Sequence, residues 1–362
     1  MDVADFSAAG LYDPAAPDAP ERLALLEHLA ARGVSLDQMR EYDDAGSLHA
    51  AASDGSVRPG APRSIEQVAA AAGITVDLLR RVVAASGIRI ADDDFRDVDE
   101  QTFGLFALGA EMFGQEPLLR FTRVMGSALA GVADAALSLF LVTVEDPMLR
   151  QGAAPVDRAR STEDATAALE AIPAVMNGLF RGHVERAIER QRASTAYDVA
   201  PGAFRLAIGF VDLVGFTPLA REMDPAELAE LIESFEMTAH DVVSSRGGRV
   251  VKHIGDEVMF AGVDPVDAAH VARELVDRFS SQQGVRPHAG LAYGAVIGRG
   301  GDYYGPVVNL ASRIADIAVP DEILVTRELV DATGHAPGLT FESAGRRQLK
   351  GFDEPVALWS LT

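Results

Sequence analysis

The sequence predicts two parts of different fold class, an all-α N-terminal half and a C-terminal α+β domain of the ferredoxin-like kind. The chain has 362 residues, which is the length of about two domains. Before about residue 200, apolar residues recur at helical spacing and no segment alternates convincingly as a strand does. Beyond residue 202, short apolar runs and amphipathic helices alternate around a hairpin, so we expect a sheet with helices on one face.

Composition and charge exclude several classes of protein. The chain is 48% hydrophobic and 24% charged, as globular proteins are, and its formal net charge is −22. A field of that sign repels nucleic acid and anionic membranes, so we expect no nucleic-acid partner. The absence of cysteine excludes disulfides, thiolate metal sites and thiol nucleophiles. The first residues do not resemble a secretory signal, so we expect a cytoplasmic protein.

The first 63 residues contain two expected helices. Residues 1–20 are rich in Ala, Asp and Pro, and we expect a loosely held arm there. Helical spacing over residues 21–32 stops at a glycine, and a short helix follows over residues 35–42. Residues 43–63 contain several glycines and prolines and are expected to form a loop.

Residues 64–87 have the pattern helix, turn, helix. Ser64 and Gln67 form a capping box, and Gly73 opens the turn. The pattern is typical both of a DNA-binding helix-turn-helix and of a plain αα-hairpin. Because the acidic run at 92–100 follows at once, we favour the hairpin.

An apolar helical stretch follows over residues 99–144. Its segment 126–144 is about as long as a bilayer span, but Asp134 lies at the centre, where a charge costs about 2.5–3.5 kcal/mol. We expect a buried helix of a soluble domain, ended near Pro147, and no transmembrane segment. A membrane contact or a lipid-binding surface is the alternative, so the N-terminal domain is a candidate to bind a lipid or small molecule.

These patterns divide the chain into three segments. Residues 1–158 form an all-α domain, residues 159–200 a helical linker and residues 201–362 the α+β domain. In the linker we expect Ser161 to cap a long helix that Pro173 kinks.

The α+β domain begins after a Pro-Gly pair at 201–202. Asp224 and Pro225 mark a helix start, and the Gly255–Asp256 pair marks a hairpin turn. We expect strands at 204–212, 249–254, 257–261, 286–298 and 322–326, helices at 224–246, 265–282 and 307–318, and a closing strand pair within 339–361.

Two carboxylates occupy positions suited to chemistry. Asp212 ends a buried strand, and Asp256 lies on the hairpin turn, so both can meet at one edge of the sheet. Two carboxylates placed together are costly as bare charges and suit hard cations such as Mg²⁺, although each alone is also typical of an ordinary turn. The turn after Asp212, with Gly215 and Thr217, leads into a helix and could cradle a triphosphate.

Three motifs, FVDLVGFT, VKHIGDEVMF and DYYGPVVNLASR, in this order resemble the class III adenylyl cyclase catalytic domain. The resemblance covers about 160 residues, from Phe204 to the C-terminus, and LKGF near the end agrees with it. It implies a ferredoxin-like cyclase fold and conversion of ATP to 3′,5′-cyclic AMP and pyrophosphate.

The resemblance also implies the metal site. Asp212 and Asp256 match the family's two metal-binding aspartates, which hold two Mg²⁺ or Mn²⁺ ions per site. One metal would lower the pKa of the ribose 3′-hydroxyl, and the other would bind triphosphate oxygens. The carbonyl of Leu213 would lie near a metal, and Phe216 and Thr217 would bind substrate in the following turn.

The remaining site residues match the second and third motifs and the C-terminal segment. Lys252 and Asp302 match the pair that selects adenine, in which Lys donates to N1 and Asp accepts from the N6 amino group. Asn309 would position the ribose, and Arg313, four residues later on the same helix face, would stabilise charge at the α-phosphate. Lys350 matches a lysine that contacts the terminal phosphates.

The resemblance implies a head-to-tail homodimer, because the family takes the metal aspartates from one catalytic domain and the other contacts from its partner. The N-terminal half resembles the helical regulatory domain of the autoinhibited, pH-sensing actinobacterial (mycobacterial) cyclases, with His183 and His253 as candidate sensors. The alternatives are a catalytically silent cyclase-like module that binds nucleotide or a signalling partner, and a DNA-binding regulator.

Overall fold

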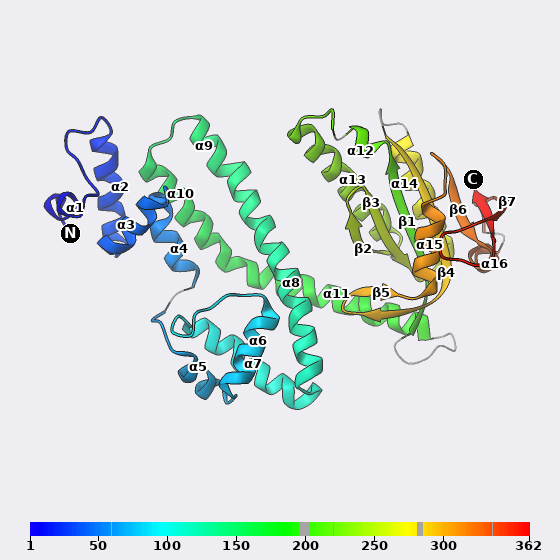
Figure 1. The fold of residues 1–362 in the computed structure, drawn as a ribbon, viewed down its shortest axis with the longest axis horizontal. Coiled ribbons are helices and arrows are strands. Elements are labelled where there is room, and N and C mark those ends of the chain that lie inside the picture. Colours follow the sequence, from blue (N-terminus) through cyan, green and yellow to red (C-terminus); the bar gives the residue numbers. More distant parts are fainter. Residues whose placement is uncertain (59, 196–202, 220, 281–284, 335) are drawn as a thin grey trace. The chain divides into compact units, whose positions relative to one another are not determined.

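The computed structural model describes residues 1–58, 60–195, 203–219, 221–280, 285–334 and 336–362. The chain divides into two compact units, Met1–Phe180 and Arg181–Thr362. Figure 1 shows the first unit as helical, and the second carries a sheet with its helices. The mixed architecture is the one predicted.

The N-terminal segment forms a small helical core, not a loose arm and a loop. The helices are α1 (Val3–Ala8), α2 (Ala19–Ala31), α3 (Leu36–Asp44), the 3₁₀ turn η1 (Leu48–Ala50) and α4 (Ala51–Val57). Asp2 and Asp5 form a capping box that starts α1, and Phe6 is 1% exposed. Leu48 is also buried in this core, so the predictions of an arm at 1–20 and a loop throughout 43–63 were wrong. Buried apolar side chains override the loop-like composition of both segments.

The predicted helix-turn-helix is present and packs as an αα-hairpin. It consists of α5 (Ile65–Ala72) and α6 (Val76–Ser86), packed with α7 (Asp97–Phe113) and the start of α8 (Gln115–Phe140). The Ser64–Gln67 capping box starts α5, and Gly73 ends it with φ 69°. Two arginines of α6 that could face DNA phosphates are paired with acids of the chain, Arg80 with Asp92 at 2.6 Å and Arg81 with Glu116.

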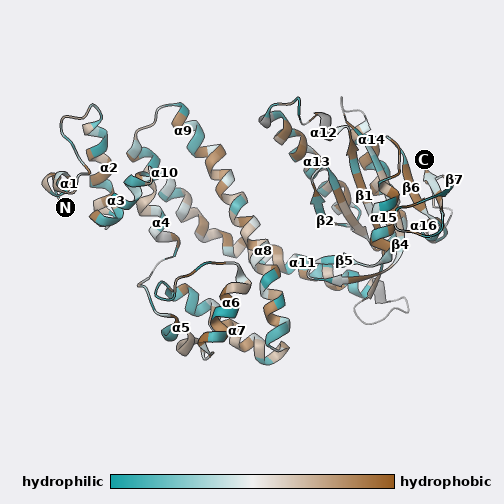
Figure 2. Cartoon of the chain, viewed as in Figure 1, coloured by the Kyte–Doolittle hydropathy of each residue, from teal (hydrophilic) through white to brown (hydrophobic). Residues whose placement is uncertain are grey.

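The apolar helix α8 is exposed, so the prediction of a buried helix was wrong. Together with a π-helical turn (Leu141–Glu145) and α9 (Asp146–Arg150), it forms one helical run from Gln115 to Arg150. Its length and composition would allow it to cross a membrane, and its most apolar window is 0% buried within the described structure. Figure 2 shows hydrophobic residues along this helix. Hydropathy measures how apolar the side chains of a helix are, but it does not indicate whether other parts of the protein cover them.

The helix was expected to end near Pro147, but it continues past this residue. Pro147 lies just after the π-helical turn, where the regular α-helical hydrogen-bond pattern is already interrupted, and the helix continues to Arg150. The turn that ends the run follows at Gly152, which has φ 69°.

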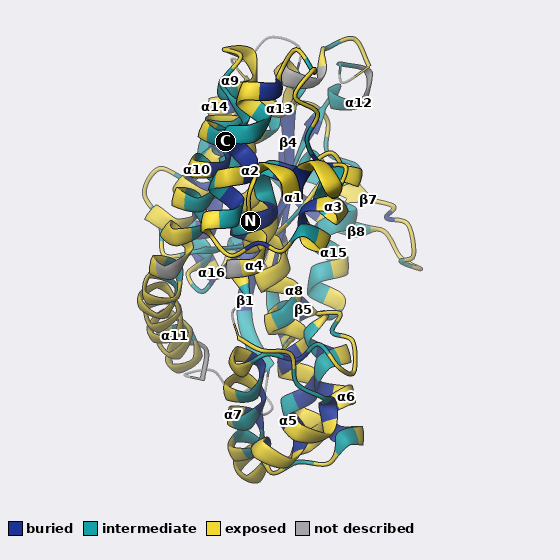
Figure 3. Ribbon diagram, turned by 90° about the vertical axis from the view of Figure 1, so that its left-hand side faces the viewer, coloured by how far each residue is buried: buried dark blue, intermediate teal, exposed yellow. Residues whose placement is uncertain are grey.

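The segment predicted as a linker is helical, and its first helix starts earlier than the predicted cap at Ser161. Helix α10 (Pro155–Ala168) has Pro155 at its start, so Ser161 lies in the interior of the helix and does not cap it. A 3₁₀ turn, η3 (Leu169–Ala171), precedes α11 (Ile172–Thr195), so Pro173 lies in the first turn of a new α-helix and not inside one long helix. Figure 3 shows α11 exposed along most of its length. The expected boundary at 201–202 lies outside the described residues.

The described residues of the second unit contain an eight-stranded sheet of order β2-β3-β1-β4-β6-β8-β7, with β5 paired to β4. The β4–β6 pair is parallel and the other pairs are antiparallel. The strands are β1 (Ala203–Val214), β2 (Arg249–Ile254), β3 (Glu257–Gly262), β4 (Arg286–Arg299), β5 (Asp302–Tyr304), β6 (Ile323–Thr326), β7 (Phe341–Arg347) and β8 (Val356–Leu361). The sequence did not predict β5.

Helices cover both faces of the sheet, so the prediction of one covered face was wrong. The helices are α12 (Phe216–Leu219), α13 (Pro225–Ser245), α14 (Pro265–Ser280), α15 (Pro306–Ala315) and α16 (Arg327–Thr333), the last of which was not predicted. Odd positions of β1, such as Val211, pack with α13, α14 and α16. Even positions, such as Ile208 and Phe210, pack with α15. Strand β1 is apolar throughout its middle because it is covered on both sides.

Candidate active site

An acidic group lies where β1 ends, on the sheet face that carries α15. Asp212 stands opposite Glu257 of β3 and His288 of β4, so these three side chains share that face. The His288 Nε2 lies 3.6 Å from Asp212 Oδ2. Asp256 lies on the adjoining β2–β3 turn, where Gly255 has φ 67° and permits a tight hairpin.

Burial and mutual repulsion perturb these groups. Burial raises the pKa of Asp212, and the neighbouring Asp256 carboxylate raises it further. Burial also raises the pKa of Glu257 to about 7, with added repulsion from Asp212 and Asp316. Burial lowers the pKa of His288, an effect that Asp212 opposes. Negative charge is therefore concentrated here at a cost that a cation would relieve.

The donor set fits hard divalent cations. Asp212 and Asp256 offer carboxylate oxygens, which Mg²⁺ and Mn²⁺ prefer. Across the ranges that the structure describes, no group of three or more His, Asp or Glu side chains is arranged as a metal cage. Two carboxylates suit a cation that takes its other ligands from substrate phosphates and water.

The turn that follows Asp212 contains three further predicted residues. Leu213 is buried in the core, and its backbone opposes part of the rise in the pKa of Asp212. Gly215 has φ 89°, and α12 begins at Phe216, whose half-buried ring packs against the core. Thr217 belongs to α12, but its side chain lies outside the described part of the structure.

The structure brings Lys252 and Asp302 together. Lys252 Nζ lies 2.6 Å from Asp302 Oδ2, although the two residues belong to strands that are not paired. A β-bulge between Val250 and Lys252 shifts the register of β2, so that Lys252 stands opposite Met259 and faces the α15 side of the sheet. Bulges commonly redirect a side chain next to a functional site.

Helix α15 carries Asn309 and Arg313 one turn apart. Pro306 stands in its first turn, and Asn309 is exposed. Arg313 Nη1 lies 2.6 Å from Asp316 Oδ2, and Asp316 is one of the groups that repel Glu257. The arginine is therefore linked through one carboxylate to the acidic group.

Close packing fixes the height of α15 above the sheet. A Cβ atom at Gly290 of β4 would lie 2.2 Å from the Ala315 nitrogen and 2.6 Å from the Ala311 carbonyl oxygen. The helix backbone therefore rests directly on this glycine, with no side chain between them.

Lys350 stands apart from the other predicted residues. It is exposed in the loop between β7 and β8, next to the buried Leu349. Over the part of the chain that the structure describes, no hydrogen bond or ion pair joins it to the rest of the candidate site.

Three residues of the site, Glu257, His288 and Asp316, were not predicted from the sequence. Glu257 follows Asp256 directly, and Asp316 lies three residues beyond Arg313, so spacing could have drawn attention to both. His288 is a lone polar residue in an apolar strand, and only strand register places it opposite Asp212.

Comparison with known proteins identifies the C-terminal unit. Residues 202–362 match the family described as the adenylate and guanylate cyclase catalytic domain. An uncharacterized protein of Mycobacterium tuberculosis H37Rv is 31% identical over 380 residues, covering 100% of this chain and 94% of that protein. An adenylate cyclase of Streptomyces coelicolor is 49% identical over 122 residues, 33% of this chain and 32% of that protein. A pH-sensitive adenylate cyclase of Mycobacterium tuberculosis CDC 1551 is 28% identical over 356 residues, 94% of this chain and 87% of that protein.

Proposed function

This chain belongs to the class III adenylate and guanylate cyclase family and is an adenylate cyclase, and we propose that it forms cyclic AMP at sites shared by two copies of the chain. The reaction converts ATP to 3′,5′-cyclic AMP and pyrophosphate. The observation that carries this proposal is the Lys252–Asp302 pair, at 2.6 Å, in a domain that also carries the Asp212–Asp256 carboxylates. A lysine donor beside a carboxylate acceptor complements adenine and opposes guanine.

The chemical roles follow from the side chains. Asp212 and Asp256 would hold two Mg²⁺ or Mn²⁺ ions, which when bound favour ionisation of the ribose 3′-hydroxyl and neutralise phosphate charge. The guanidinium of Arg313 would bind oxygens of the α-phosphate through its planar fork of donors. Asn309, exposed one turn earlier on α15, would hold the ribose. Lys350 would contact the terminal phosphates.

A homodimer would complete these sites. Lys252 and Asp256 lie four residues apart on one hairpin, and the family resemblance assigns them to opposite sites of a symmetric pair. A second copy would also cover exposed apolar residues of α8, such as Leu137 and Leu139. Both features favour association of two chains through surfaces that a lone chain leaves open.

We propose a cytoplasmic enzyme whose N-terminal half restrains the catalytic unit in a pH-dependent way. We propose His49 as the sensor, because its ring contacts charged groups of two other elements. Its Nε2 lies 3.2 Å from Glu145 and 3.0 Å from Arg158 Nη2, with Asp54 as the third charged group nearby. A second histidine, His28, lies 2.8 Å from Glu163 on α10.

The sign of the effect follows from the pKa of His49. Burial and the Arg158 charge lower this pKa, so the described packing favours the neutral imidazole over the charged one. The packing is most favoured above about pH 6.5, and a state that releases His49 to solvent gains stability as the pH falls below that value. Acidification would therefore loosen the contacts among η1, the π-helical turn and α10. His183 is exposed on α11, and His253 lies on β2 beside Lys252.

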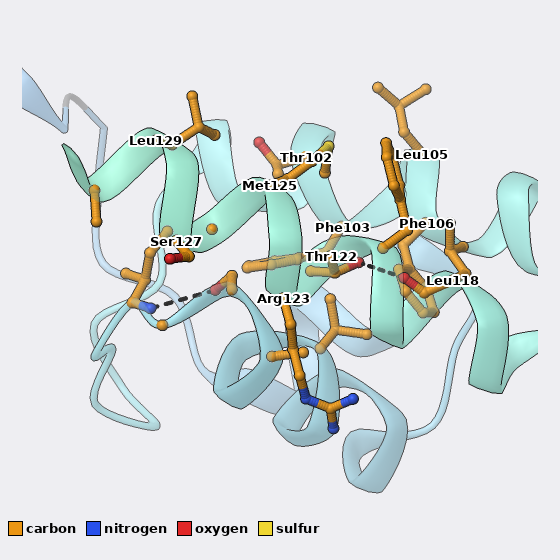
Figure 4. Close-up of a pocket in the computed structure, with 18 of the residues that line it drawn as sticks. Thr102, Phe103, Leu105, Phe106, Leu118, Thr122, Arg123, Met125, Ser127 and Leu129 are labelled. Atoms are coloured by element: carbon orange, nitrogen blue, oxygen red, sulfur yellow. Dashed lines mark hydrogen bonds between the residues drawn. The ribbon is translucent and has the colours of Figure 1, made fainter. Parts of the chain in front are cut away.

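The N-terminal unit also offers an apolar pocket that we propose as a lipid or small-molecule site. It has a volume of about 790 Å³ and lies among α6, α7 and α8 (Figure 4). Phe103, Phe106 and Leu118 line it. The Thr122 hydroxyl donates to the Leu118 carbonyl at 2.9 Å, so its polar atom is already satisfied. A lining of this kind suits an apolar ligand.

The experiment is a direct assay of the full chain. Purified protein is incubated with ATP and Mn²⁺ at several values between about pH 5.5 and 8, and cyclic AMP is measured. Asp256→Asn serves as the control that keeps the shape of the hairpin residue and removes its charge. Cyclic AMP from the wild type and none from this variant is the expected result. Equal activity of both proteins would refute the metal assignment.

A further inference from the structure

The β4–β5 hairpin that carries Asp302 has a tight turn of defined conformation. Its turn consists of two residues, Gly300 and Gly301, with φ 63° and 83°. Both values require left-handed backbone, as a type I′ turn does, and glycine adopts it without strain. Asp302 is the first residue after the turn and stands opposite Arg299, so its place depends directly on where the hairpin tip is held.

Arg249 of β2 holds this tip from the side. Its Nη2 donates to the carbonyl of Gly301, and its guanidinium carbon lies 5.7 Å from the ring centroid of Tyr303. Tyr303 is buried and meets Phe204 of β1 edge to face, with ring centroids 6.1 Å apart. One arginine therefore contacts the residue on each side of Asp302.

The β-bulge in β2 makes this arrangement possible. Arg249 stands opposite Ala261, and Lys252 stands opposite Met259. These two partners lie two residues apart on β3 and therefore share one face of the sheet. In a regular strand, residues three apart point to opposite faces. The extra residue of the bulge places Arg249 and Lys252 on the same face of the sheet, where both contact the β4–β5 hairpin.

The two contacts to the hairpin differ in what they do during binding. The Lys252–Asp302 ion pair is partly open to solvent, with side chains 43% and 24% exposed, and ion pairs this exposed contribute little to stability. Under the proposed function, adenine would take the Lys252 donor at N1 and the Asp302 acceptor at N6. Lys252 and Asp302 have enough donors and lone pairs to bind the base and each other, so this exposed ion pair alone does not fix the direction of Asp302 toward the base.

We infer that Arg249 is a positioning residue, which keeps Asp302 within hydrogen-bonding distance of adenine when the base binds beside Lys252. The inference rests on the proposed function and adds a specificity-determining residue to it. Arg249 acts through the Gly301 carbonyl and the Tyr303 ring, and it has no role toward the phosphates or the ribose.

The test compares two substitutions at this position in the full chain. Arg249→Met removes the donor and the charge while keeping a long apolar stem, and Arg249→Lys keeps a donor and the charge. Arg327→Met is the matched control, because Arg327 also lies over an aromatic ring, Trp359, at 5.4 Å, on an element outside the candidate site. For each protein, kcat and KM are measured with ATP and with GTP, together with the thermal midpoint.

The expected result separates positioning from general stability. Arg249→Met should raise KM for ATP about tenfold and lower the ATP-to-GTP ratio of kcat/KM about tenfold, because one polar contact to the base is misplaced. Arg249→Lys should recover part of the ratio, and Arg327→Met should keep it.

Two outcomes would overturn the inference. An unchanged nucleotide ratio in Arg249→Met would show that Asp302 needs no support from Arg249. A ratio that falls equally in Arg327→Met would show that any loss of stability in the sheet produces it. A wild-type protein that forms no cyclic AMP would instead refute the proposed function, so the two failures are distinguishable.

Discussion

Substitution of Gly290 by alanine should disable catalysis without touching any residue of the candidate site. The added Cβ atom would lie 2.2 Å from the Ala315 nitrogen and 2.8 Å from the Ala315 Cα. Both are backbone atoms of α15, which cannot rotate away as a side chain can. The helix itself must move off the sheet.

The size of this movement follows from the contact distance. Ordinary contacts of a Cβ atom begin at 3.4 Å, so α15 must shift by about 1 Å. The shift would carry Asn309 and Arg313 with it, since both lie on α15. A 1 Å misplacement of positioning groups costs about 100-fold in rate. Overpacking of this kind also costs about 1–3 kcal/mol of stability, which lowers the thermal midpoint by roughly 2–12 °C for a unit of this size.

The assay measures kcat for cyclic AMP formation alongside the thermal midpoint and far-ultraviolet circular dichroism. Gly294→Ala is the control, because it lies on the same strand, and its Cβ would meet only the Val307 Cγ2 methyl of α15, at 2.8 Å. We expect a folded Gly290→Ala protein with a rate about 100-fold below that of Gly294→Ala. Equal rates in the two variants would refute the claim that the height of α15 determines activity.

Three further predictions follow from other parts of the chain. Asp212→Ala and Arg313→Ala should each be inactive as homodimers, whereas an equal mixture should recover about a quarter of wild-type activity; an inactive mixture with heterodimers verified by mass spectrometry would contradict shared sites. Phe6→Ala should lower the unfolding free energy of the N-terminal unit by about 3–5 kcal/mol in a denaturant titration, and a change below 1 kcal/mol would be inconsistent with its burial. His49→Gln should flatten the acid side of the pH–activity profile while the exposed His183→Gln leaves it unchanged, and the reverse pattern would place the sensor on α11.

The strands of the catalytic unit could be predicted because short apolar runs in the sequence indicate which strands are buried. The run from Phe204 to Asp212 is apolar at both odd and even positions, and β1 is buried there on both faces. The same observation argues for helices on both sides of the sheet, which the prediction of one covered face overlooked. The short strand β5 was missed because its three residues depend on pairing with β4 for their structure.

The candidate metal-binding aspartates could be proposed from sequence because a strand end and a hairpin turn are local features. The partners of these residues could not, since register decides them. The register of the β1–β4 pair places His288 opposite Asp212. The bulge in β2 and the β4–β5 hairpin together bring Lys252 to Asp302. In the N-terminal half, α1 was missed because its determinants, a two-residue capping box and the buried Phe6, are few and lie among residues typical of loops.

The π-helical turn that joins α8 to α9 amounts to one surplus residue in an otherwise α-helical run. Such turns are recognised as single-residue insertions that survive because they bring a particular side chain into place. Here the surplus ends at Glu145, whose carboxylate lies 2.7 Å from Arg158 and 3.2 Å from His49. An α-helical path through the same five residues would rotate Glu145 further around the helix axis, because an α-helix turns about 100° per residue and the wider π-helix turns less. The π-helical turn therefore sets the direction of Glu145 relative to the apolar surface of α8, and a return of this turn to α-helical geometry would move the carboxylate away from His49.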